Sequence, residues 1–303
     1  MLRDGKIALV VIALLACISF GLAGCNGSAV EQQDVAPVGA AYSQPDQVAL
    51  PEVADEGPSI DASHVADGYV VARESNAARL KFQVACGDAA YNYDLPNNGT
   101  PTVFPVNMGD GSYRFRIMKN TDGNNYAEAQ SVEADVTLSS EFAPFLLPNQ
   151  YCWYDGESAC VAKARELAEG AASEAEVVQR VSDYIVENVA YDTDKAEVLS
   201  AKTGYIPNPD ATLADGTGVC FDYAALGAAM LRSLGIPAKV ITGNVSPGDL
   251  YHAWIMVYVD GTWHKGTLGV QPNEWSRLDL TFAAANGAAP AGDGTNYVDR
   301  YVY

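Results

Sequence analysis

The chain has 303 residues, of which 49% are apolar and 18% are charged, a balance typical of a folded globular protein. It carries 18 Lys and Arg against 38 Asp and Glu, a formal net charge of −20 at pH 7. Nucleic-acid binding depends on clustered Lys and Arg, so this charge argues against a nucleic-acid partner. Three histidines leave little room for a multi-metal centre, and no metal or cofactor is expected.

The N-terminus has the layout of a secretory signal peptide, since Arg3 and Lys6 precede an apolar run over residues 7–22. This run is shorter than the roughly 20 apolar residues that a transmembrane helix needs. Leu22-Ala23-Gly24-Cys25 resembles the bacterial lipobox, in which the cysteine is acylated and becomes the new N-terminus. The resemblance implies a signal peptide over residues 1–24 and an outward-facing protein that Cys25 anchors in the bacterial cell membrane. An ordinary signal peptide with a chance cysteine is the alternative.

Residues 25–66 contain scattered acidic residues and four prolines, at positions 37, 45, 51 and 58. Neither a period of 2 nor a period of 3.6 is present in this segment. The composition predicts a flexible tether between the lipid anchor and the folded body.

Residues 67–150 are rich in short strands. Runs that favour strands occur at residues 80–84, 103–106, 113–117 and 132–138. The Gly- and Asn-containing segments 107–111 and 120–124 are each typical of a hairpin turn. Together they predict a small all-β, sandwich-like domain. We expect a spacer or docking module, with a ligand-binding role as the alternative.

The segment 151–303 is expected to be the second domain, and it opens with two helices. The first is predicted over residues 157–169, and the second begins at Ser173-Glu174-Ala175-Glu176, a capping-box pattern. The segment 191–218 contains Gly and Pro and is expected to be a loop.

A helix is predicted from Cys220 to Leu234, where Gly235 and Pro237 end it. Cys220 therefore lies in the first turn, after a Gly-containing loop. The unpaired N–H groups and the dipole at that position favour a thiolate, the nucleophile that acyl transfer needs. A buried, inert cysteine is the alternative.

His252 begins an apolar strand after the cysteine helix. If the strand packs on that helix, His252 can take the proton of the thiol and return it to a leaving amine. A structural histidine is the alternative.

Three segments resemble the transglutaminase-like superfamily of papain-type cysteine enzymes: Gly218-Val219-Cys220-Phe221-Asp222, residues 231–238 and His252-Ala253-Trp254. Residues 188–191 and Asp192 are similar to a segment that bacterial members carry before the cysteine. The resemblance covers residues 157–282. It implies an α+β fold in which a helix that bears the nucleophile Cys220 packs on an antiparallel sheet that supplies His252 and an acid.

The third triad member departs from the family pattern. The family places an Asp shortly after a Trp that follows the histidine, but after Trp263 the sequence continues with His264-Lys265-Gly266-Thr267. The pattern recurs later, where Asp279 follows Trp275. We expect Asp279 to orient the ring of His252. A Cys–His dyad, a degenerate site, or His264 as a substitute partner are the alternatives.

Three further cysteines follow Cys25, namely Cys86, Cys152 and Cys160. An exported protein permits a disulfide, and Cys152 with Cys160 is the closest pair. No Cys-x-x-Cys spacing for zinc is present.

The expected function is a membrane-anchored, extracytoplasmic, cysteine-dependent amide hydrolase, peptidase or transamidase that acts through a thioester. Its expected partner is a peptide or protein substrate, including material associated with the cell wall. The alternative is a non-catalytic lipoprotein that uses the same fold to bind such material.

Overall fold

The computed structural model describes residues 42–245, 250–259, 274–286 and 297–303. The expected signal peptide and Cys25 lie outside the described residues, as do Trp263 and His264. No helix within the described ranges is long and apolar enough to cross a membrane.

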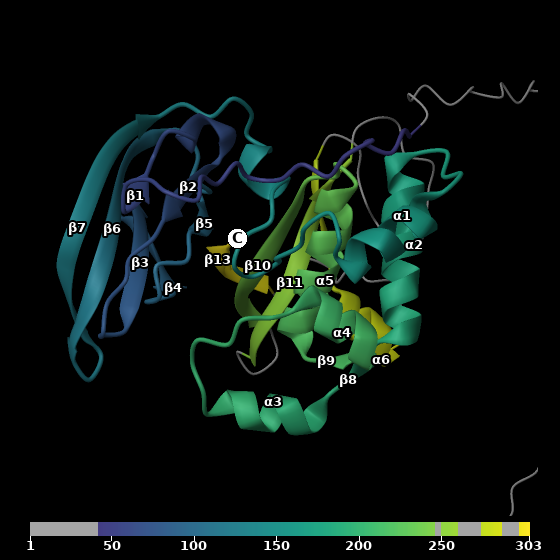
Figure 1. The fold of residues 1–303 in the computed structure, drawn as a ribbon. Helices are drawn as coiled ribbons and strands as arrows, with labels where there is room; N and C mark the ends of the chain where they lie inside the picture. Colours follow the sequence, from purple (N-terminus) through teal and green to yellow (C-terminus); the bar gives the residue numbers. More distant parts are fainter. Residues whose placement is uncertain (1–41, 246–249, 260–273, 287–296) are drawn as a thin grey trace, which may run out of the picture. The chain divides into compact units, whose positions relative to one another are not determined.

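The N-terminal part of the described chain is rich in β-structure, as predicted, and consists of two antiparallel sheets (Figure 1). The larger sheet has the order β4-β3-β6-β7, with bounds Ala89–Leu95, Leu80–Cys86, Gly111–Asp122 and Asn125–Val136. The smaller has the order β1-β2-β5, with bounds Ile60–Asp61, Tyr69–Ala72 and Thr102–Pro105. Phe82 of β3 stacks on Phe104 of β5 with ring centroids 4.5 Å apart, so the sheets share one core.

One of the two predicted hairpins is wrong. The turn at residues 120–124 does join neighbouring strands, β6 and β7. Residues 107–111, however, connect β5 to β6, and β5 pairs with β2 in the other sheet. Alternation along a strand shows which side chains face a core but not which strand lies beside it, so the turn residues here mark a crossing between sheets.

The described part of the expected tether, from residue 42 onward, makes defined contacts with the body. The hydroxyl of Tyr42 donates to the carbonyl of Leu234 at 3.1 Å, and Ile60 is buried in β1. The Arg73 guanidinium donates to the carbonyl of Asp55 at 2.6 Å. These contacts are made by individual residues that follow neither a helical nor a strand period. The sequence pattern therefore predicted a flexible tether.

The C-terminal half is an antiparallel sheet covered by helices (Figure 1). The sheet has the order β12-β11-β10-β13, with bounds Trp275–Leu278, Leu250–Tyr258, Ala238–Val245 and Tyr297–Val302. The helices α1 (Ala159–Ala168), α2 (Glu174–Asn188) and α5 (Cys220–Ser233) lie at or close to their predicted positions. Helix α5 packs against β10 and β11 and also against α1 and α2.

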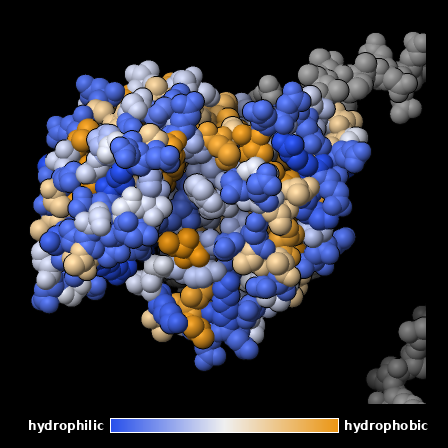
Figure 2. Space-filling view, viewed as in Figure 1, coloured by the Kyte–Doolittle hydropathy of each residue, from blue (hydrophilic) through white to orange (hydrophobic). Residues whose placement is uncertain are grey.

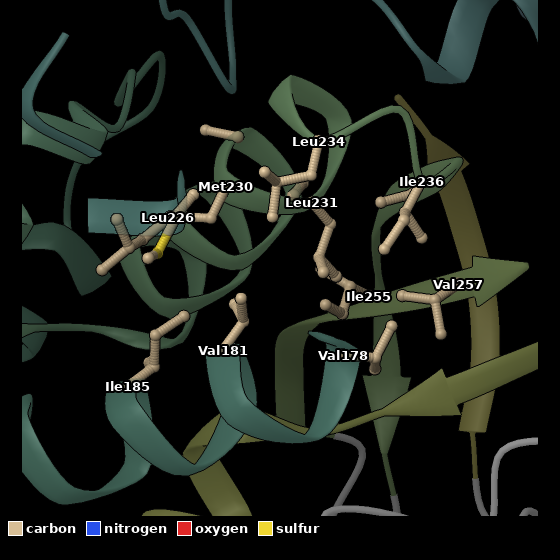
Figure 3. Close-up of a cluster of buried hydrophobic side chains, with 14 of the residues drawn as sticks. Val178, Val181, Ile185, Leu226, Met230, Leu231, Leu234, Ile236, Ile255 and Val257 are labelled. Carbon is tan, nitrogen blue, oxygen red and sulfur yellow. The ribbon is translucent and has the colours of Figure 1, made fainter. Parts of the chain in front are cut away.

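The core of this half brings together three elements far apart in the sequence (Figure 3). Val181 of α2, Leu231 of α5 and Ile255 of β11 are all at most 1% exposed. Helix α5 is rich in alanine and packs closely on both sides, so it is buried almost throughout, and only its first two residues are partly exposed. This packing fixes the helix end that bears Cys220.

The prediction of a loop over residues 191–218 is wrong in part. The segment contains α3 (Thr193–Ser200), α4 (Pro209–Asp215) and a short parallel pair of strands, β8 (Ala190–Tyr191) and β9 (Thr217–Gly218). Helix α3 has no buried residue, so it lacks the apolar period that marks a helix in a sequence. Its start is stabilised instead by the Asp192 carboxylate, which accepts from the backbone N–H of Lys195 at 2.8 Å.

The described surface is mainly polar, in keeping with the charge. Figure 2 shows hydrophilic residues over most of one face, with hydrophobic residues gathered in separate patches.

Candidate active site

Cys220 is the first residue of α5, directly after the N-cap residue Val219. Its side chain is partly exposed, at the helix end where backbone N–H groups and the helix dipole favour a negative charge. The turn before it is tight, because a Cβ on Gly218 would lie 2.7 Å from the Cβ of Asp222. The glycine is therefore needed to bring the chain into α5 at this angle.

His252 is the third residue of β11 and is 3% exposed. Its Nε2 lies 2.8 Å from Oδ2 of Asp279, and Cys220 is a second neighbour that raises its pKa. Because Nε2 faces the carboxylate, Nδ1 is the ring nitrogen left for the thiol. The ring of Phe282 stacks on the imidazole at 4.5 Å, almost parallel, and covers one of its faces.

The pKa of His252 is raised from its ordinary 6.5 to about 9. Burial is the largest influence and opposes the charged form, but the interactions with Asp279 and Cys220 together outweigh it. The site thus favours an imidazolium at neutral pH.

Asp279 lies between β12 and α6 (Leu280–Asn286) and is 1% exposed. Its Oδ1 accepts from the backbone N–H of Phe282 at 3.0 Å, and its Oδ2 accepts from the hydroxyl of Tyr297 at 2.7 Å. The carboxylate therefore caps α6 and holds His252 at the same time. The sheet places it there, because β12 pairs with β11 up to Leu278 opposite Ile255.

Two glycines allow the close approaches behind these side chains. A Cβ on Gly227 of α5 would lie 2.7 Å from the Leu280 side chain, which begins α6 directly after Asp279. Gly243 of β10 lies opposite His252, and a Cβ there would lie 2.0 Å from the carbonyl oxygen of Val298 in β13. The structure thus brings Cys220, His252 and Asp279 together from three elements.

A second buried carboxylate, Asp222, lies one residue beyond Phe221 in α5 and is fully buried. It accepts from the backbone N–H of Val219 at 2.8 Å and from the hydroxyl of Tyr205. The ammonium of Lys195 in α3 lies 2.7 Å from its Oδ2. The paired lysine offsets a negative charge close to Cys220. Together, Lys195 and Tyr205 connect α3 and the loop after it to the start of α5.

Residues 161–279 match a family model described as the transglutaminase-like superfamily. This part of the chain is a transglutaminase-like domain. The match begins within α1 and ends at Asp279, so it includes all three side chains of the candidate site. No curated protein matches the chain.

Solved structures similar to the chain include a proposed cysteine protease from Cytophaga hutchinsonii, at 18% identity and a TM-score of 0.37, with 78% of this chain and 83% of that one covered. LapG from Legionella pneumophila, EGTA-treated, is similar at 15% identity and a TM-score of 0.34, over 48% of this chain and 70% of that one. Red sea bream transglutaminase is similar at 13% identity and a TM-score of 0.30, over 70% of this chain and 48% of that one.

Tyr191 is a further residue of the transglutaminase-like domain that reaches the site. It ends β8 and pairs with Gly218, two residues before Cys220. Its side chain is 46% exposed, and its pKa is raised by burial and by the neighbouring Cys220. The sequence resemblance included this tyrosine in a segment but gave it no role. Asp222 and Tyr297 were missed as site residues, because nothing in their spacing connects them to the triad.

Cys152 and Cys160, the pair closest in the sequence, form no disulfide. Both are free and fully buried. The thiol of Cys152 faces Asn149 at 3.5 Å, whereas the Asp210 carboxylate raises the pKa of Cys160 in addition to burial. The two cysteines therefore lie in separate surroundings within the core of the C-terminal half. Cys86, in the N-terminal sheets, is also free.

Within the described ranges, no group of three or more His, Cys, Asp or Glu side chains could hold a metal ion.

Proposed function

We propose that the chain is a cysteine-dependent amide hydrolase or peptidase, with Cys220 as nucleophile, His252 as general acid and base, and Asp279 as the acid that orients His252. The observation that carries this proposal is the buried pair of His252 and Asp279, with the partly exposed Cys220 beside the histidine. A purely structural role for His252 would explain neither its raised pKa nor its position beside a partly exposed thiol at a helix start.

In the first half of the reaction, the Cys220 thiolate attacks the carbonyl carbon of the scissile amide and forms a tetrahedral oxyanion. The backbone N–H of Cys220 and the hydroxyl of Tyr191 are the donors we assign to this oxyanion. Collapse of the intermediate breaks the C–N bond. His252 gives its proton to the leaving amine, and a thioester on Cys220 remains.

In the second half, neutral His252 takes a proton from water while the water oxygen attacks the thioester. The thiolate leaves, the carboxylic acid product departs, and His252 is again an imidazolium. An amine in place of water would give transamidation. We propose hydrolysis, because water is abundant at a partly exposed thiol.

The proposed location and substrate follow from the sequence. The lipobox-like Cys25 supports a location on the outer side of the cell membrane. The net charge of −20 suits basic or neutral peptides, including cell-wall peptides, better than acidic ones. The non-catalytic alternative depended on the missing acid after Trp263. Asp279 supplies an acid beside His252, which favours the enzyme.

The test is the pH dependence of Cys220 alkylation in the full chain, followed by the mass of the peptide that contains it. We expect the rate to reach half its maximum well below about 8.5, the pKa of a free thiol. His252→Ala should abolish this early rise, whereas the control His64→Ala, in the N-terminal region, should retain it. An ordinary thiol profile in the unaltered chain would exclude the triad.

A further inference from the structure

Tyr297 joins the triad from a strand that the family model does not include. Its hydroxyl donates to Oδ2 of Asp279 at 2.7 Å, and the same oxygen accepts from Nε2 of His252 at 2.8 Å. The other oxygen of Asp279 accepts from the backbone N–H of Phe282. The carboxylate, 1% exposed, thus has three donors, two of which share one oxygen.

The position of Tyr297 is fixed from several sides. As the first residue of β13 it pairs with Val245 of β10. Its ring meets the ring of Trp254 edge to face at 4.9 Å. The guanidinium of Arg277 lies over the Tyr297 ring, 4.2 Å from the ring centroid. A cation over a phenol ring makes the phenol hydroxyl a better hydrogen-bond donor. The hydroxyl is therefore held toward Asp279.

Two donors on one carboxylate oxygen compete for its charge, so each bond weakens the other. We propose that Tyr297 is a positioning residue of the triad, which fixes the Asp279 carboxylate and limits the negative charge that it presents to His252. This inference rests on the proposed function. A histidine whose pKa is too high is a weak acid toward the leaving amine. Little of it is then neutral and able to act as a base toward water.

Among the described residues, the titratable and charged groups around His252 come from five elements. Cys220 lies on α5, Asp279 at the start of α6 and Tyr297 on β13, while Arg277 of β12 acts on the Tyr297 ring and Tyr191 of β8 acts on Cys220. Of these, the Tyr297 hydroxyl can be removed without changing a formal charge. This makes its contribution measurable.

The experiment titrates His252 by NMR in the full chain with labelled histidine. Tyr297→Phe keeps the ring and removes the hydroxyl, and Tyr301→Phe on the same strand is the matched control. We expect Tyr297→Phe to raise the pKa of His252 by about half a unit, a threefold change in the protonation constant, because Asp279 then bonds to His252 alone. The change in the Cys220 alkylation rate at alkaline pH should likewise move to higher pH. Tyr301→Phe should change neither.

An unchanged or lowered pKa in Tyr297→Phe, or an equal shift in Tyr301→Phe, would overturn the inference. Arg277→Met is the second variant, which keeps the hydroxyl but makes it a weaker donor. It should shift the pKa of His252 upward by less than Tyr297→Phe, and a downward shift would again contradict the proposal. If His252→Ala leaves the alkylation profile of Cys220 unchanged, the proposed function itself fails. If that variant abolishes the early rise while Tyr297→Phe has no effect, only the role of Tyr297 fails.

Discussion

Asp279→Asn tests the link on which the candidate site depends. The variant keeps the shape of the side chain but removes the negative charge that faces His252. The pKa of His252 stands at about 9 against an ordinary 6.5, a difference that corresponds to about 3 kcal/mol in favour of the imidazolium. Burial opposes the charged ring, and only the contribution of Cys220 would remain to offset it. We therefore expect the pKa of His252 to fall below 7.

The assay is an NMR titration of a chain that has only three histidines, which makes the His252 signal simple to assign. Asp67→Asn is the control, because Asp67 lies 3.2 Å from His64 on the exposed surface of the N-terminal region. It should leave the titration of His252 unchanged. A His252 signal that still titrates near 9 in Asp279→Asn would refute the reasoning, since the charge would then have another source.

The same change predicts how stability depends on pH. A histidine with a raised pKa stabilises the folded state fully below its unfolded pKa, near 6.5, and loses this contribution as the pH rises through about 9. Urea unfolding should therefore show a larger difference between the unaltered chain and Asp279→Asn at pH 6 than at pH 9.5, by about 2 kcal/mol. An equal difference at both pH values would contradict the assignment of the charge to His252.

Three further predictions concern the surroundings of the site. Lys195→Met should reduce the free energy of unfolding by about 1–3 kcal/mol in urea titrations, because it leaves the buried Asp222 without its cation while Lys195 itself is partly exposed. Gly243→Ala should cost about 3 kcal/mol or more in thermal unfolding and slow Cys220 alkylation, because its Cβ would displace β13 at Val298; a stable and fully reactive variant would show that the strand can move freely. Cys25→Ser should move the protein from the membrane to the soluble fraction of bacterial cells, and continued membrane attachment would exclude the lipid anchor.

The sequence was most informative where local chemistry alone decides the structure. Gly235, with φ of 78°, ends α5 as predicted, and the Ser173 hydroxyl accepts from the N–H of Glu176 at the start of α2. Asp279 could be predicted from its spacing to a tryptophan. Its contact with His252 depends on the pairing of β11 with β12, which the sequence does not specify.

What the sequence could not predict depends on contacts between distant residues. Helix α3 has no buried residue, so no apolar face in the sequence could reveal it. A cap and the ion pair of Lys195 with Asp222 stabilise it instead. The hydroxyl of Tyr297 contacts Asp279 because β13 pairs with the edge of β10 that faces away from β11. The number of residues between Tyr297 and Asp279 in the sequence does not reveal this pairing. Turn residues at 107–111 marked a change of direction correctly but could not show that the next strand belongs to another sheet.

The order of strands in the C-terminal sheet has a consequence for when the protein becomes reactive during its synthesis. Strand β13 lies beside β10, so this sheet is complete only after residues 297–302 have left the ribosome. The N-terminal sheets can fold first, because domains generally fold as units in the order of synthesis. A nascent chain that ends before Tyr297 should thus contain Cys220, His252 and Asp279 but lack the strand that completes the sheet around them. Arrested chains of increasing length, probed for Cys220 alkylation at pH 7, should gain reactivity once β13 is included, and full reactivity in much shorter chains would contradict this order.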